Sequence, residues 1–89
     1  MTGMGKKKIE EIIAAAINNP ADVLFTDLCL VCNYFFGEPR KRGTSHRVYK
    51  TPWQGDPRVN IQKAGNKAKN YQVKQVLRAI SRVEKEHGQ

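Results

Sequence analysis

The chain has 89 residues, of which 39% are hydrophobic and 27% are charged, and its formal net charge is +8. This length holds one domain with one small core, which excludes barrel and dinucleotide-binding enzymes, and the composition is that of a globular chain. No apolar run approaches the roughly 18 residues of a membrane helix. Glu10 and Glu11 interrupt the apolar stretch that follows the basic start, so a secretion signal is not expected. Two cysteines are too few for a disulfide framework, and we therefore expect a cytoplasmic protein.

Two amphipathic helices are predicted in the first part of the chain. Residues 6–18 carry one apolar stripe at helical spacing, and the Asn-Asn-Pro sequence that begins at Asn18 ends this helix. A second helix is predicted from Thr26, a favourable N-cap, to Gly37, a typical C-terminal glycine. The stripes predicted to be buried are Ile9, Ile12, Ile13, Ala16 and Ile17 in the first helix, and Leu28, Val31, Cys32 and Phe35 in the second.

Strand patterns follow the second helix, and one more helix ends the chain. Residues 39–42 suit a short edge strand or an extended arm, and residues 46–51 and 58–62 are rich in strand-forming side chains. The alternation in 58–62 predicts that Val59 and Ile61 point inward, whereas the buried side of 46–51 stays open. The last helix is predicted over residues 71–85. The predicted fold is therefore α+β, with a small three-stranded antiparallel sheet whose one face is covered by helices.

The positive charge is concentrated in one segment. Residues 38–78 hold eleven Lys and Arg against two acids, which gives 11 − 2 = +9, more than the whole surplus of +8. A polyanion is the natural partner of such a surface, and nucleic acid is the most common one. The alternative is a basic surface that merely keeps the protein soluble.

Few residues suit catalysis. The pair Cys29-x-x-Cys32 lies inside the second predicted helix without further cysteine ligands, so both are expected to be buried structural thiols. No acidic pair in the basic segment is spaced for metal binding, and no phosphate loop is present, so we expect neither metal nor cofactor. His46 remains, placed at a strand start after a Gly-Thr-Ser turn. Histidine exchanges protons near neutral pH, and an RNA 2′-OH is an internal nucleophile, so one positioned imidazole can start cleavage. An ordinary exposed strand histidine is the alternative.

Basic side chains near His46 and before the last helix are candidate RNA ligands. Cations close to the scissile phosphate stabilise the charge that develops in the transition state, and a helix N-terminus flanked by lysines can hold phosphates. A solvated basic face is the alternative for the second group. The predicted RNA-binding residues are Lys41, Arg42, Ser45, Arg47, Lys50, Lys67 and Lys69.

The segment after the second helix resembles the G-S-x-H signature of the HicA-type toxins, small ribonucleases of toxin–antitoxin pairs. It reads Gly43-Thr44-Ser45-His46-Arg47-Val48-Tyr49. The resemblance extends to a Phe-x-Asp-Leu helix start at residues 25–28, to the hairpin at 58–61 and to the final basic helix. It covers residues 26–85, about two thirds of the chain, as a single domain with residues 6–18 as an additional N-terminal helix.

The resemblance implies a double-stranded-RNA-binding-like fold and a metal-independent endoribonuclease that cleaves mRNA. His46 would be its single catalytic histidine, and Gly43 would form the turn that presents it. The protein would be the toxin of a type II pair, inhibited in complex with a HicB-type antitoxin. Two alternatives stay open: a non-catalytic RNA- or DNA-binding module of the same fold, and an adaptor whose basic face binds an acidic protein.

Overall fold

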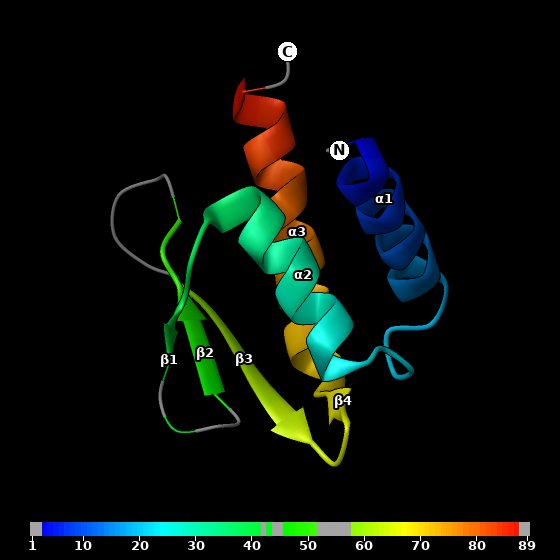
Figure 1. The fold of residues 1–89 in the computed structure, drawn as a ribbon, viewed down its shortest axis with the longest axis vertical. Coiled ribbons are helices and arrows are strands. Elements are labelled where there is room, and N and C mark those ends of the chain that lie inside the picture. Colours follow the sequence, from blue (N-terminus) through cyan, green and yellow to red (C-terminus); the bar gives the residue numbers. More distant parts are fainter. Residues whose placement is uncertain (1–2, 42, 44–45, 52–57, 88–89) are drawn as a thin grey trace.

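The computed structural model describes residues 3–41, 43, 46–51 and 58–87, which form an α+β fold with a four-stranded antiparallel sheet (Figure 1). The predicted class is therefore confirmed, although the sheet has one strand more than the three that the sequence predicts. The elements in chain order are α1 (Gly3–Asn18), α2 (Phe25–Phe36), β1 (Arg40–Lys41), β2 (His46–Tyr49), β3 (Val59–Ala64), β4 (Lys67–Ala68) and α3 (Asn70–His87).

The strands lie in the sheet in chain order, β1-β2-β3-β4, so each pairs with its sequence neighbours. Strand β3 is the longest and pairs with β2 through its first four residues and with β4 through its last two. In the β2–β3 register, Arg47 lies opposite Ile61 and Tyr49 lies opposite Val59. This register decides which side chains share a face of the sheet, because directly opposed residues of an antiparallel pair point the same way.

Strand β4 is the element that the sequence analysis missed. A two-residue turn, Gly65-Asn66, joins it to β3, and Gly65 has a φ of 67°. Glycine at the first central position of a two-residue hairpin turn gives the twist that the flanking strands need. The backbone N–H of Ala68 also donates to the carbonyl of Val23 (2.9 Å), and the N–H of Phe25 donates to the carbonyl of Asn66 (3.1 Å). The segment before α2 therefore borders the β4 edge.

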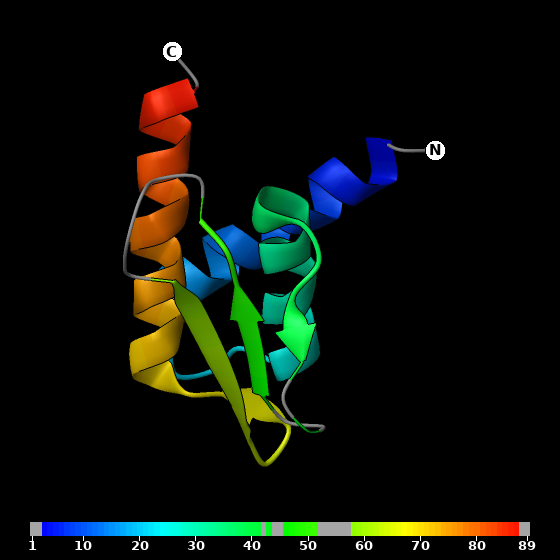
Figure 2. The ribbon, with the colours of Figure 1, turned by 90° about the vertical axis from the view of Figure 1, so that its left-hand side faces the viewer.

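The molecule has three layers, which are the sheet, then α2 and α3, then α1 (Figures 1 and 2). Helix α1 packs on the two other helices, on the side away from the sheet (Figure 1). Ile9, Ile12 and Ala16 of its predicted stripe are buried in the common core, so this helix extends the core. The last residue of the stripe, Ile17, is 65% exposed, so the prediction that it is buried is wrong.

Helix α2 begins earlier than predicted, with its N-cap two residues before Thr26. Its N-cap is Leu24, which gives no side-chain cap, and Thr26 lies within the first turn. The carbonyl of Leu24 accepts the N–H of Leu28 (3.0 Å), so the backbone closes the first turn without a hydroxyl cap. The predicted end is confirmed, since Gly37 has a φ of 85° and its N–H donates to the carbonyl of Asn33 (3.0 Å).

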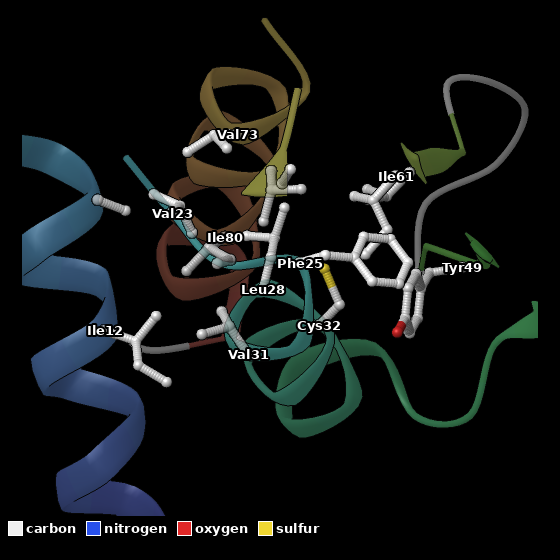
Figure 3. Close-up of a cluster of buried hydrophobic side chains, with 14 of the residues drawn as sticks. Ile12, Val23, Phe25, Leu28, Val31, Cys32, Tyr49, Ile61, Val73 and Ile80 are labelled. Carbon is white, nitrogen blue, oxygen red and sulfur yellow. The ribbon is translucent and has the colours of Figure 1, made fainter. Parts of the chain in front are cut away.

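One hydrophobic core joins all three layers (Figure 3). Val59 and Ile61 point into it as predicted, and Tyr49 settles the open question about β2 because its side chain is fully buried. Cys32 is also fully buried, and both cysteines are free thiols. No helix in the described part of the chain is long and apolar enough to span a membrane.

Candidate nucleic-acid interface on the sheet

Strand β2 sends successive side chains to opposite faces of the sheet. Arg47 and Tyr49 lie opposite the buried Ile61 and Val59, so they share the face that α2 and α3 cover. His46 alternates with them and therefore belongs to the other face. We call this second face, which carries His46, Val48 and Lys50 of the β2 segment, the open face; Figure 2 views the molecule from this side.

His46 is half-buried at the first position of β2. The loop before it contains Gly43, whose φ of 68° lies in the region that favours glycine. The rest of the predicted Gly-Thr-Ser turn lies outside the described residues, so the role of Gly43 in presenting His46 stays a prediction. Arg42 and Ser45, which the sequence analysis includes among the RNA ligands, lie outside the described residues.

The cross-strand neighbour of His46 is tied to helix α3. Gln62 lies opposite His46 in the β2–β3 pair. Its backbone N–H donates to the side-chain Oε1 of Gln72 (2.7 Å), and the Gln72 Nε2 donates back to the Gln62 Oε1 (3.5 Å). Gln72 is only 4% exposed, so α3 supplies a buried amide as the partner of the Gln62 N–H. This N–H lies past the two residues of β3 that pair with β4, so a side chain takes the place of a strand partner. This arrangement fixes the position of the strand segment beside His46.

A cavity of about 390 Å³ opens on the same face, two to four residues further along β2. Arg40 enters it from β1, where it lies opposite Val48, and Arg58 enters it from the start of β3. Its lining residues are Glu38, Pro39, Arg40, Val48, Lys50 and Arg58. Three cations against one carboxylate give this cavity a net positive charge, which suits an anionic ligand.

Two of the predicted ligands lie on the covered side instead. Lys41 and Arg47 line a second cleft of about 290 Å³ between α2 and the β1–β2 edge, which shares only Glu38 and Pro39 with the first. The Arg47 guanidinium lies over the Phe25 ring, 5.6 Å from its centroid, and its Nη1 donates to the carbonyl of His46 (3.2 Å). The sequence analysis placed Lys41 and Arg47 together with Lys50 among the candidate RNA ligands near His46. The strand alternation separates the first two from Lys50 and from the imidazole.

The same cleft contains a hydrogen-bonded hydroxyl. The Tyr49 O–H donates to the Asn33 Oδ1 (3.0 Å) and approaches the carbonyl of Cys29 (3.5 Å). Burial raises the pKa of Tyr49 far above its usual value, and burial also raises the pKa of the Cys29 and Cys32 thiols. These groups stay protonated at neutral pH, so neither thiol has the character of an activated nucleophile. The prediction of structural thiols fits this environment, most closely for Cys32.

The lysines before α3 have local roles. Lys67 forms an ion pair with Asp22 of the connector before α2, and both side chains are about half exposed. Lys69 is half-buried, and its carbonyl accepts the N–H groups of Gln72 and Val73 (3.0 Å each) at the start of α3. Their predicted phosphate contacts stay predictions.

The sequence analysis missed three residues of the open face, Glu38, Arg40 and Arg58. The alternation within β2 already placed Lys50 on the side of His46, and this signal was available. Arg40 lies in β1 and Arg58 directly precedes β3, so their approach depends on the register of β1 and β3 against β2. No group of three or more His, Cys, Asp or Glu suited to a metal occurs among the described residues. Comparison with protein-family models, with characterised proteins and with solved structures gives no match for this chain.

Proposed function

We propose that this protein is a metal-independent endoribonuclease that uses His46 as its proton-transfer residue. The observation that supports this most strongly is the placement of His46. A half-buried imidazole and a cavity lined by three cations share the one face of the sheet that the helices leave uncovered. A single RNA strand lying along β2 would meet both.

The proposed reaction needs one positioned base. A nitrogen of the His46 imidazole takes the proton of a ribose 2′-OH, and the freed oxygen attacks the adjacent phosphorus. The bond from phosphorus to the 5′-oxygen of the next nucleotide breaks, and that oxygen takes a proton from the imidazolium. The products are a 2′,3′-cyclic phosphate and a 5′-hydroxyl end. The nucleophile belongs to the RNA itself, so this route does not require a metal-activated water.

The wider assignment rests on the resemblance of residues 43–49 to the HicA-type toxins. On this proposal the protein is the toxin of a type II toxin–antitoxin pair that cleaves mRNA in the cytoplasm. A HicB-type antitoxin would inhibit it by covering the open face. The positive charge of that face, from Arg40, Lys50 and Arg58, predicts that the covering surface is acidic.

The test compares RNA cleavage by the wild type, His46→Ala and His87→Ala, which removes the only other histidine of the sequence. We expect His46→Ala to lower the cleavage rate at least about 100-fold, the lower range for loss of a general base. It should also abolish growth inhibition, while far-ultraviolet circular dichroism stays that of the wild type. His87→Ala should cleave like the wild type, and excess EDTA should leave cleavage unchanged.

Three outcomes would contradict the proposal. Full cleavage by His46→Ala would show that this residue takes no part in the mechanism. Loss of cleavage in EDTA would show that the mechanism depends on a metal. A wild type that shifts the RNA in a gel but leaves it intact makes the protein a binding module without chemistry. The gel shift and the fragment pattern are read from the same incubation, so these readings are separated directly.

A further inference from the structure

We propose that the cavity lined by Glu38, Arg40, Lys50 and Arg58 is a subsite for one ribonucleotide of the RNA, separate from the cleavage position at His46. The inference rests on the proposed function for its substrate class. It adds a second contact that fixes where along a strand the cut falls.

The cations of the cavity are available to a ligand. Arg40, Lys50 and Arg58 are exposed, and none of them forms an ion pair with another described residue. Arg40 belongs to β1, Lys50 directly follows β2 and Arg58 directly precedes β3, so they approach the cavity from three backbone segments. Two guanidinium groups and an ammonium in one concave site are suited to the oxygens of a phosphate.

The remaining lining residues favour a nucleotide over a bare phosphate. The Glu38 carboxylate repels an anion but accepts hydrogen bonds, and a ribose hydroxyl is a donor that DNA lacks at the 2′ position. Pro39 and Val48 provide an apolar surface for a sugar or a base. The cavity of about 390 Å³ falls within the usual size range of small-molecule sites.

The distance along the strand separates this subsite from His46. Lys50 follows His46 by four residues, which is about 13 Å of extended strand. Stacked nucleotides rise about 3.4 Å each, so the bound nucleotide lies up to about four positions from the cut, and fewer where the strand is unstacked. The enzyme would therefore cleave at a fixed offset from the nucleotide that it holds.

The binding test uses the full chain with His46→Ala, which keeps a fluorescent 12-mer RNA intact, and reads affinity by anisotropy over a range of salt. We expect Arg58→Gln or Lys50→Gln to weaken binding about tenfold and to flatten the salt slope by about 0.7, the value of one phosphate contact on a single strand. The matched controls are Arg78→Gln and Lys74→Gln on α3, which lose the same charge away from the open face. Equal losses in variants and controls overturn the subsite.

The ribonucleotide preference is tested by replacing the carboxylate. With His46→Ala as background, RNA should bind more tightly than DNA of the same sequence, and Glu38→Leu, whose side chain has no hydrogen-bond acceptor, should remove the difference. Equal binding of RNA and DNA before that change overturns the role given to Glu38.

A substrate scan separates failure of the subsite from failure of the proposed function. Uncharged methylphosphonate links replace the phosphates one to four positions from a mapped cut on either side. We expect wild-type cleavage to drop at one position besides the cut, and this drop to be absent in Arg58→Gln. A flat scan overturns the subsite while His46-dependent cleavage still stands. A different outcome is that the wild type cleaves no RNA while Arg58→Gln and Lys50→Gln still weaken RNA binding. In that case the proposed function fails and the subsite stands.

Discussion

The two faces of the sheet differ in chemistry although one strand supplies both. On the covered face Tyr49 is fully buried beside Ile61 and Val59, and Arg47 lies against Phe25. On the open face the same strand carries a half-buried histidine, and a cationic cavity lies beyond it. Neighbours in sequence thus have unrelated roles. A basic cluster read along the chain therefore has to be divided by strand alternation before any of its members is assigned to a ligand.

The sharpest contrast between the faces is in stability. Ile61→Ala leaves a cavity in the core, because the side chain is fully buried between the sheet and the helices. We expect it to lower the free energy of unfolding by about 2–5 kcal/mol, the usual cost of such a truncation. Val48→Ala on the open face should cost less than about 1 kcal/mol. Urea unfolding followed by circular dichroism measures both, and similar losses would contradict the assignment of faces.

A second contrast concerns the hydrogen bonds that hold β3 against α3. Gln72→Leu removes the acceptor of the Gln62 N–H and leaves that part-buried strand N–H without its partner. Such a loss costs about 1–3 kcal/mol. Gln75→Leu, a half-buried position one turn along α3, is the control and should change stability little. Hydrogen exchange of the Gln62 amide gives a local reading, and unchanged protection in Gln72→Leu would show that the bond does not hold the strand.

Most helices and strands could be predicted because each carries its own periodic signal. The last helix carries an apolar stripe at helical spacing, Val73, Val76, Leu77, Ile80 and Val83. The first, second and fourth of these are buried, and the other two are half-buried. Strand β4 could not be predicted from residue preferences, because Lys67-Ala68 has no strand-forming character and its pairing depends on the turn at Gly65 and on the segment before α2. Gln72 was missed for the same reason, since its partner is a backbone group of another element.

The candidate site could be predicted in part. His46 was singled out from its residue type and its turn, and in the structure it lies half-buried on the open face of the sheet. The cations around it could not be assigned, because charge says nothing about direction. Lys41 and Arg47 lie on the covered side, whereas Arg40 and Arg58 reach the open face only through the strand register.

The covered face should also limit stability at high pH. Burial raises the pKa of the Cys32 thiol and of the Tyr49 hydroxyl above their ordinary values of 9.0 and 10.0. The unfolded chain loses these protons near its ordinary pKa values while the folded chain keeps them. Above pH 9 the unfolded state therefore binds fewer protons, and the free energy of unfolding falls as pH rises.

The expected fall is at most about 1.4 kcal/mol per pH unit for each group. Urea unfolding between pH 7 and pH 11 measures it, with little change expected between pH 7 and pH 8. Cys32→Ala is less stable overall but should decline less steeply above pH 9. If the free energy of unfolding falls as steeply with pH in Cys32→Ala and in Tyr49→Phe as in the wild type, other groups cause the loss.

The smallest expected effect on stability concerns the ion pair at the β4 edge, away from the open face. Asp22→Asn removes the partner of Lys67, and the half-exposed pair should contribute less than about 1 kcal/mol. If Lys67 binds phosphate as predicted, its release should also strengthen RNA binding severalfold and steepen the salt slope by about 0.7. Asp27→Asn in the first turn of α2 makes the same charge change without releasing a lysine from an ion pair with a described residue, and is the control. Equal salt slopes in the two variants would show that Lys67 does not bind phosphate and only joins the connector before α2 to β4. The cations of the open face would then be the ones that bind the RNA.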